Sequence, residues 1–398
     1  MLLALIAGFA LSQAFRTITA ILAVDLQGEF GLSPQALGTF AGAFAFAFGA
    51  MQLFVGVGID LYGLRRTVLA AFPLAIAGAL LSALAPAYGW VLAGQVLIGL
   101  GCAPAFLVCT VFIARHFPPQ RFAFVSGVAM GLGGLGMLLT GTPLAWLVQW
   151  SSWRMGFGVL AALSLAAWLL IWWQVHEPEG AAHGAAGESF GRALRGFGAL
   201  FLLPHTAGIL LLALVTYASF LTLRGLWLGP LLIERHGFSL VQSGNIALLV
   251  SLVSLVGPAL YGRADPGPAR RRRRRRIVGH TLLLGAIFGA MAGLHSSWLD
   301  VGGALLTGVL SGFIVLQYAD VRAAYPAALT GRALSVFTMA MFVGVALAQW
   351  LSGAAATVAM AHGADPYRAV LGLLALLLVL GAAAFAGLPA PKEKFDKK

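Results

Sequence analysis

Twelve long apolar runs follow one another along this chain, and they restrict it to folds that a lipid bilayer can hold. A helix that crosses a bilayer needs roughly 20 predominantly apolar residues. Apolar residues make up 60% of the 398 positions and charged residues only 10%, too few polar groups to cover a water-soluble globule. We therefore predict an all-α polytopic membrane protein. Its predicted spans lie at 2–24, 33–57, 67–88, 90–114, 122–149, 155–175, 205–232, 240–262, 278–295, 299–319, 333–359 and 367–388.

The positive charges are distributed unevenly between the loops. One set of alternate loops, together with the C-terminus, holds 20 of the 25 lysines and arginines, whereas the opposite loops hold 3. Cytoplasmic loops of membrane proteins carry the excess of positive charge. We therefore predict that both termini are cytoplasmic and that the membrane is a bacterial-type inner (plasma) membrane. The two remaining basic residues, Arg16 and Arg224, fall inside predicted spans.

A long polar segment divides the spans into two sets of six. We predict an N-terminal half at 1–175, a cytoplasmic linker at 176–204, a C-terminal half at 205–389 and a cytoplasmic tail at 390–398. An internal repeat supports this division, because Gly31-Leu32-Ser33 corresponds to Gly237-Phe238-Ser239 at one constant offset, and Gly38 to Gly244 at the same offset. Two repeated halves with a binding site between them are a known plan for transporters.

A short charged turn separates the second and third spans. It contains Gly56, Asp60, Gly63, Arg65 and Arg66. In this spacing it resembles the signature of the major facilitator superfamily, Gly-x-x-x-Asp-(Arg/Lys)-x-Gly-(Arg/Lys)-Arg-Arg or close variants, although Leu61 and Leu64 stand where basic residues are common. The resemblance implies twelve helices in two six-helix halves, and a secondary transporter that works by alternating access.

By the same resemblance, this turn is a conformational gate. Asp60 would hold the two halves together on the cytoplasmic side in the outward-open state and release them when the inward-open state forms. A carboxylate near helix ends accepts charge-assisted hydrogen bonds, which gives such a latch a physical basis. The alternative is that Asp60 and the arginines only cap a solvated turn.

The fourth and fifth spans differ from some members of the family. Gln95 precedes Gly99 by four residues, where related transporters carry an arginine that helps to couple proton movement. The glycine-dense fifth span lacks the ending that resembles drug antiporters. Its glycines at 131–136 fit a dinucleotide-binding pattern, but no strand precedes them. We expect them to serve close helix packing instead.

Arg16 and Arg224 are the principal candidates for substrate binding. A charge inside the membrane is costly, so it usually faces the bundle interior or an aqueous cavity. The two arginines lie in the first and seventh spans, which are counterparts in the two halves. Arginine stays protonated and offers a planar fork of donors that matches carboxylate, phosphate or sulfonate. We expect the pair to hold one anion, with Asp25 or backbone carbonyls as the alternative, structural partners.

Further polar residues inside the spans are candidates for the same site. They are Gln13, Tyr217, Gln52, Asn245 and Gln317, with Gln349 as an additional one. Gln13 and Tyr217 lie on the same helix faces as Arg16 and Arg224. Each of these residues has an alternative role as a hydrogen-bonding contact between helices.

Seven consecutive arginines, Arg270 to Arg276, lie between the eighth and ninth predicted spans. A polybasic segment beside a membrane attracts anionic lipid head groups. Topological anchoring is the simpler interpretation of the same charges. No aromatic residues interleave the tract, so we do not expect it to bind nucleic acid.

The sequence thus predicts a secondary transporter for a small, anionic solute, coupled to a proton or to an exchanged anion. One alternative is an efflux or uptake carrier for neutral or amphiphilic compounds, in which both arginines are neutralised internally. A membrane sensor that keeps the transporter fold is an alternative of another class. We expect no enzyme activity, catalytic residue, metal site or cofactor, because the sequence contains neither a zinc-protease helix motif nor a phosphate-binding P-loop.

Overall fold

The computed structural model describes residues 1–176, 198, 200–266 and 269–390, and within these residues the fold consists of helices without strands. The first half comprises α1 (Leu2–Thr17), α2 (Thr19–Phe30), α3 (Pro34–Tyr62), α4 (Leu64–Ala83), α5 (Tyr88–Cys102), α6 (Pro104–His116), α7 (Pro119–Gly134), α8 (Gly136–Leu139), α9 (Thr142–Trp150) and α10 (Trp153–Gln174). The second half comprises α12 (Thr206–Thr222), the π-helix η1 (Leu223–Trp227), α13 (Leu228–Pro230), the π-helix η2 (Leu231–Arg235), α14 (Leu240–Arg263), α15 (Arg270–Gly293), α16 (Ser297–Leu310), the 3₁₀-helix η3 (Ser311–Phe313), α17 (Ile314–Ala324), α18 (Ala327–Ala361) and α19 (Pro366–Gly387).

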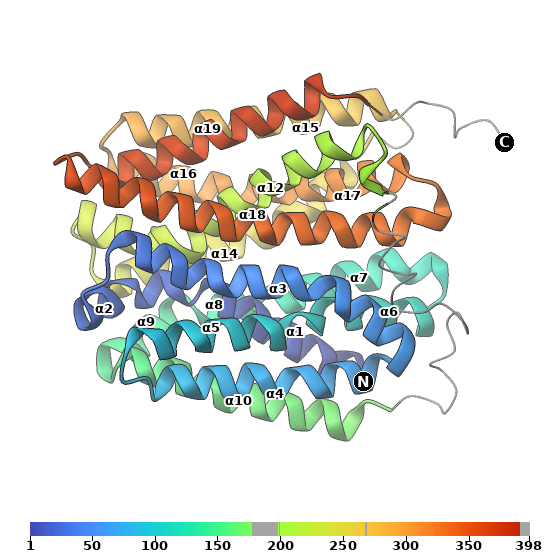
Figure 1. Ribbon diagram of the computed structural model, residues 1–398, viewed down its shortest axis with the longest axis horizontal. Helices are drawn as coiled ribbons and strands as arrows, with labels where there is room; N and C mark the ends of the chain where they lie inside the picture. Colours follow the sequence, from blue (N-terminus) through green and yellow to red (C-terminus); the bar gives the residue numbers. More distant parts are fainter. Residues whose placement is uncertain (177–197, 199, 267–268, 391–398) are drawn as a thin grey trace.

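The described residues contain 11 helical segments long and apolar enough to cross a membrane, or 12 when the bent pair α1 and α2 counts as one span. The two members of that pair meet at an angle of 45°. Each segment overlaps one of the twelve predicted spans, so the all-α polytopic fold is confirmed. The halves lie one above the other in Figure 1, and the N-terminus and the end of α19 lie at the same end of the bundle.

The internal repeat has a structural cause at the corners between spans. Gly31 and Gly237 adopt positive φ angles of 59° and 70°, which favour glycine and turn the chain after a helix. Ser33 and Ser239 then cap the next helix, because their hydroxyl oxygens accept hydrogen bonds from the backbone amides of the first turn. The same two devices therefore begin the second and the eighth spans.

The two halves touch along α3 and α18 through glycines. A Cβ atom at Gly42 would lie 3.0 Å from the carbonyl oxygen of Ala346, and one at Gly49 would lie 3.0 Å from the Cβ of Phe342. A Cβ at Gly38 would collide with the carbonyl oxygen of Gln349. Small residues let helix backbones approach closely inside a membrane, and this seam holds the halves together on that principle.

The glycines of the fifth span also serve close packing, as the sequence predicts. A Cβ at Gly133 would overlap the ring of Phe9, and one at Gly136 would overlap the carbonyl oxygen of Ala10. The span is interrupted between α8 and α9, where the amide of Gly141 bonds to the carbonyl of Leu138, three residues back. This tighter bond releases the carbonyl of Met137 from the helical pattern.

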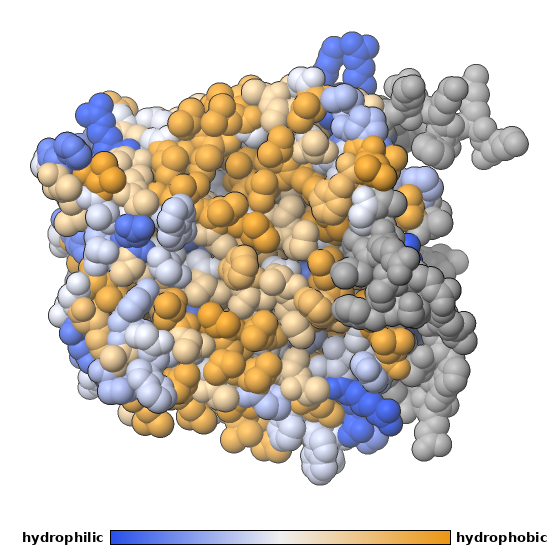
Figure 2. Space-filling view, in the orientation of Figure 1, coloured by the Kyte–Doolittle hydropathy of each residue, from blue (hydrophilic) through white to orange (hydrophobic). Residues whose placement is uncertain are grey.

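Apolar residues cover the middle of the surface shown in Figure 2, and hydrophilic residues gather towards its two ends. Large apolar side chains that are exposed on the protein include those of Trp146, Trp172, Leu283 and Val358. A soluble monomer rarely exposes so extensive an apolar surface, whereas a bilayer solvates it. The protein is therefore an integral membrane protein.

The arginine tract is not a loop, and this part of the sequence prediction was wrong. Arg270 to Arg276 form the first two turns of α15, so the ninth span begins earlier than residue 278. Arginine has a high helix propensity. Ion pairs with Asp265 and Asp320 also reduce the repulsion between neighbouring guanidinium groups.

The predicted domain boundaries remain predictions. Most of the linker at 176–204 and all but the first residue of the tail at 390–398 lie outside the described residues.

Candidate substrate site between the halves

The first and seventh spans meet through glycines in the portions that lie away from the chain termini. A Cβ at Gly225 would lie 2.7 Å from the carbonyl oxygen of Arg16, and one at Gly229 would collide with the carbonyl oxygen of Ala20. Two π-helical turns, η1 and η2, lie in this stretch of the seventh span. Such turns are frequent at functional sites, and here η1 itself packs against α1 and α2, while α13, between the two turns, packs against α2.

Arg16 lies in the interface between the halves and is held by residues of both. Its Nη2 donates to Ser12 Oγ at 3.2 Å, and its Nη1 lies 3.5 Å from the hydroxyl of Tyr217 in the other half. The guanidinium carbon lies 4.6 Å from the ring centre of Phe48 and 4.8 Å from that of Phe342. The two aromatic rings stabilise the charge, but they do not neutralise it.

Two buried glutamines lie at a narrow pocket beside Arg16, which in this conformation has collapsed and has no room for a water molecule. Arg16, Gln95 and Gln349 all line it, with exposed fractions of 8%, 1% and 2%. Arg16 Nε, Gln95 Nε2 and Gln349 Oε1 are buried and have no hydrogen-bond partner among the described residues. Buried polar atoms are nearly always paired in native proteins, so these three atoms require partners that the described residues do not supply in this conformation.

This pocket is closed on both sides in the present conformation. Phe48 and Phe342 lie towards the end of the bundle that carries the termini, and their ring centres are 4.2 Å apart. The backbone contacts of Gly225 and Gly229 close the opposite end of the first and seventh spans. The pocket residues Phe44 and Val345 lie between these two closures along their helices. The conformation is therefore occluded at the level of Arg16.

Arg224 is completely buried and joins the fifth, seventh and eighth spans. Its Nε donates to Ser251 Oγ at 3.0 Å, and its Nη2 donates to the carbonyl oxygens of Met137 at 3.1 Å and Thr140 at 3.4 Å. These carbonyls belong to the interrupted fifth span of the other half. Nη1 is buried without a partner in the part of the chain that the structure describes. Arg224 and Arg16 therefore have separate partners in this conformation.

No carboxylate pairs with either arginine among the described residues. The ion pairs that the structure describes lie near the helix ends instead. They are Glu29–Arg154, Asp300 with Arg235 and His236, Asp365–Arg235, Asp320 with Arg270 and Arg274, and Asp265–Arg273. Asp25, a possible partner of Arg16 by sequence, makes no such contact. Both central cations are thus without an acidic counter-ion in this part of the protein.

The other predicted site residues lie in varied places. Gln52 Nε2 donates to the carbonyls of Phe48 and Ala103, which is a structural role. Asn245 is exposed and accepts a hydrogen bond from Thr142 at 2.6 Å across the contact between the halves. Gln317 accepts from Thr216 at 3.1 Å and lies beside Asp320.

Gln13 is half-buried, and its Oε1 has no partner among the described residues. It does not line the pocket beside Arg16. Of the candidates predicted by sequence, only Tyr217 contacts Arg16. Gln349, the additional candidate, lines the pocket beside Arg16.

The predicted gate lies at the corner between α3 and α4. Gly63 has a φ of 84°, a conformation that favours glycine and allows the abrupt change of direction. Arg65 Nη2 donates to the carbonyl of Trp172 in α10 at 3.0 Å. The side chain of Asp60 lies outside the described part of the structure. In the second half, Asp265 holds Arg273 through two hydrogen bonds of 2.8 and 3.1 Å.

Sequence reasoning missed several residues around Arg16. Gln95 is noticeable by sequence only as a departure from a family pattern, and Ser12, Phe48 and Phe342 carry no signal of their own. Gln95 is a polar residue at a position where family members carry a charged one, and this departure is the feature of the sequence that could have identified it as a site residue.

Comparisons with known proteins agree with this architecture. The family model described as Major Facilitator Superfamily matches residues 4–273. The hexuronate transporter of Bacillus subtilis is 22% identical over 335 residues, which cover 81% of this chain and 72% of that protein. The Cupriavidus necator protein named "Probable sulfoacetate transporter SauU" is 23% identical over 296 residues, covering 69% of this chain and 66% of that protein.

A third relative and the solved structures extend the comparison. Facilitated glucose transporter member 10 of solute carrier family 2 from Mus musculus is 28% identical over 169 residues, or 40% of this chain and 31% of that protein. The crystal structure of the nucleoside transporter NupG has a TM-score of 0.77 at 16% identity, covering 97% of this chain and 99% of that one. The D-xylose-proton symporter has a TM-score of 0.73 at 16% identity, covering 99% of this chain and 98% of that one. With a family model over most of its length and this fold throughout, the chain belongs to the Major Facilitator Superfamily, and it is a membrane transporter rather than an enzyme.

Proposed function

We propose that this transporter moves a small organic or inorganic anion by alternating access and that Arg16 binds the charged group of the substrate. The supporting observation is that Arg16, Gln95 and Gln349 carry unpaired buried atoms beside one collapsed pocket, which has to open to admit the substrate. No carboxylate of the described residues neutralises Arg16. A substrate anion supplies both the missing charge and the missing hydrogen-bond partners.

The polar groups of the pocket favour an anion that also carries hydroxyl groups. Gln95 Nε2 and Arg16 Nε are donors and suit an oxyanion, while Gln349 Oε1 is an acceptor and suits a hydroxyl. The Arg16–Tyr217 contact of 3.5 Å is at the limit of a hydrogen bond, so a substrate oxygen displaces it at small cost. Relatives named as hexuronate and sulfoacetate transporters support a sugar acid or a sulfonate.

Arg224 has a different role in this proposal. Its guanidinium already binds Ser251 and the carbonyls of Met137 and Thr140, so it holds the fifth span to the seventh in the occluded conformation. It adds positive charge to the centre of the protein. Contact between the anion and Arg224 then requires the fifth span to move and release the guanidinium.

The sequence departures favour one form of coupling. The fourth span carries Gln95 in place of an arginine, and the acidic residues that form ion pairs lie near helix ends. We therefore propose anion exchange, with proton symport as the second form.

Orientation and gating complete the proposal. The positive-inside rule places both termini in the cytoplasm of a cell with a bacterial-type inner membrane. The cytoplasmic gate then contains Gly56, Asp60, Gly63, Arg65 and Arg66, with Asp60 as the latch. Cysteine labelling of loop residues from either side of the membrane tests this orientation. Modification of the Arg322→Cys variant by a reagent that cannot cross the membrane, added from outside the cell, contradicts it.

A carrier for neutral, hydroxylated solutes is the second candidate. Two glutamine side chains in the pocket suit sugar hydroxyls, and one relative is a glucose transporter by name. In that case Arg16 is a structural charge that the rings of Phe48 and Phe342 stabilise.

The test compares a charged and a neutral ligand of similar shape, in which a carboxylate replaces a hydroxymethyl group. Thermal unfolding of the purified protein is measured with glucuronate against glucose, and with sulfoacetate and phosphate as further anions. A ligand at 100 times its Kd stabilises the folded state by about 2.7 kcal/mol. Removing the charge partner by Arg16→Gln weakens binding by about 30-fold or more, which lowers the stabilisation at the same concentration to about 0.9 kcal/mol or less.

Two variants serve as comparisons. Arg224→Gln keeps the ligand response if Arg16 alone contacts the anion, although its midpoint without ligand changes. Arg322→Gln removes an exposed charge at a helix end and leaves the response intact. Stabilisation by glucose equal to that by glucuronate, retained in Arg16→Gln, refutes the anion proposal and favours the neutral carrier.

A further inference from the structure

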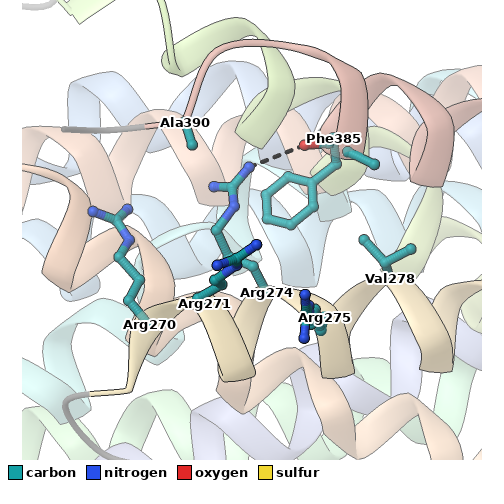
Figure 3. A pocket seen from close by; sticks show the side chains of 8 residues that line it. Arg270, Arg271, Arg274, Arg275, Val278, Phe385 and Ala390 are labelled. Carbon is teal, nitrogen blue, oxygen red and sulfur yellow. Dashed lines mark hydrogen bonds between the residues drawn. The ribbon is translucent and has the colours of Figure 1, made fainter. Parts of the chain in front are cut away.

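A cationic pocket lies between α15 and the end of α19, far from the substrate site. It has a volume of about 580 Å³ and is lined by Arg270, Arg271, Arg274, Arg275, Val278, Phe385, Ala386 and Ala390. Figure 3 shows the arginines rising from the first turns of α15, with Phe385 opposite them on α19. The four arginines share one face of the helix, because they fall at spacings of one, four and five residues.

One carboxylate serves two of these four arginines. Asp320 accepts from Arg270 Nε and from Arg274 Nη1, each at 3.2 Å. Arg274 is fixed further by the carbonyl of Phe385 at 3.0 Å and by its ring, whose centre lies 3.8 Å from the guanidinium carbon. The pocket therefore keeps a surplus of positive charge and has a rigid side formed by Arg274.

Other hydrogen-bond donors of the pocket have no acceptor within the described part of the chain. Arg270 Nη2 is buried and has no hydrogen-bond partner among the described residues. Arg271 and Arg275 are exposed, and neither forms an ion pair or hydrogen bond within the described part of the chain. Arg273, by contrast, faces Asp265 and lies outside the pocket. The tract thus separates into arginines that stabilise the fold and arginines that are available to a ligand.

The floor of the pocket is apolar and continues along the membrane-facing surface. Val278 and Phe385 line it, and one turn further along α15 the side chain of Leu282 is 43% exposed. On the neighbouring helix Val379 is 45% exposed and lies beside Gly285. A ligand with a charged head and an apolar chain fits this order of surfaces, whereas a free ion uses only the arginines.

We propose that this pocket binds the phosphate group of an anionic membrane lipid, whose acyl chains lie along Val278, Leu282 and Val379. Arginine recognises phosphate oxygens through its planar fork of donors, and Arg271 and Arg275 supply two such forks. The site is independent of the transported substrate and of the Arg16 pocket.

The test counts lipids retained by the full chain. The protein is purified with phosphatidylglycerol or with phosphatidylcholine, and bound lipid is measured by native mass spectrometry and by titration. The double variant Arg271→Gln with Arg275→Gln removes the two unpaired arginines of the pocket. The control Arg263→Gln with Arg272→Gln removes two exposed arginines outside it, so both variants lower the net charge equally.

We expect phosphatidylglycerol to bind the wild type and the control, and to bind the pocket variant about 30-fold more weakly. All four positions are at the surface, and an unchanged unfolding midpoint without lipid verifies the fold of each variant. Equal losses in both variants overturn the proposal, because they indicate diffuse attraction to the whole tract. Displacement of the lipid by millimolar inorganic phosphate overturns the lipid assignment, because the arginines alone then account for binding.

Discussion

The contact between the first and seventh spans gives a prediction about the transport cycle. Gly229 lies against the backbone of Ala20 in the occluded conformation. Opening the pocket on this side of the membrane requires the two spans to separate. We predict that Gly229→Ala shifts the conformational equilibrium towards the state that is open at the end away from the termini.

The magnitude follows from the packing. The new Cβ would collide with the carbonyl oxygen of Ala20, which is backbone and does not rotate away. Overpacking of this kind costs about 1–3 kcal/mol in the closed state. The open state, in which the backbones are apart, has no such cost. The ratio of open to closed molecules therefore rises by roughly 5- to 150-fold.

The assay is a distance distribution between two spin labels, one on each half at the end away from the termini, measured by pulsed electron paramagnetic resonance. Suitable positions are Gly28 and Ala364, which are both exposed. The buried Cys102 and Cys109 are first replaced by alanine. Gly289→Ala is the matched control, because a Cβ at that glycine meets nothing within 4 Å.

The expected result is a larger population at the longer distance in Gly229→Ala and an unchanged distribution in the control. A folded Gly229→Ala protein with the distribution of the wild type refutes the reasoning, since the glycine contact then has no influence on closure.

Two further predictions concern stability and pH. Asp300 is fully buried and binds both Arg235 and His236, so Asp300→Ala leaves His236 without its partner and Arg235 with only the partly exposed Asp365, and it lowers the free energy of unfolding by about 3 kcal/mol, measured by denaturant titration. The Glu29–Arg154 pair is partly exposed, so Arg154→Gln lowers the free energy of unfolding by no more than about 1 kcal/mol. Equal effects of Asp300→Ala and Arg154→Gln contradict this account. Burial, together with Arg270 and Arg274, lowers the pKa of His205 below its usual 6.5, so the unfolded chain binds the proton more strongly and the folded state loses stability as the pH falls through about 6.5. His205→Gln reduces this decline in unfolding midpoints between pH 7.5 and 5, and an identical decline in both proteins rules out His205 as its source.

The spans were predictable because the bilayer imposes a length on every apolar run. The ninth span was the exception, since its helix continues into a charged segment. Hydropathy marks where a helix enters lipid, but Arg270 to Arg276 extend the helix in the aqueous layer through propensity and ion pairs with Asp265 and Asp320. The bend between α1 and α2 and the π-turns of the seventh span also escape a hydropathy argument, because they depend on tertiary contacts.

The cations of the candidate site were predictable from the sequence, but the residues that contact them were not. A charge in an apolar run is visible in the sequence, so Arg16 and Arg224 are identifiable there. Their separation into two environments depends on the rotation of each helix about its axis, which one sequence without homologues does not determine. Gln95 and Gln349 meet at Arg16 although they come from different halves. The interruption that exposes the carbonyl of Met137 is likewise a property of the folded fifth span.

The glycine seam between α3 and α18 has a mechanical consequence. At Gly38 and Gly42 the approaching surfaces are backbone, so no long side chain of α3 interdigitates with α18 there. This backbone contact can act as a pivot while the two ends of the bundle alternate between open and closed, whereas the rings of Phe48 and Phe342, which lie together further along the same two helices, have to separate when the end that carries the termini opens. Hinges usually belong to loops, but here the pivot is a pair of long helices. A bulky residue at Gly42 would therefore hinder the movement of α3 against α18.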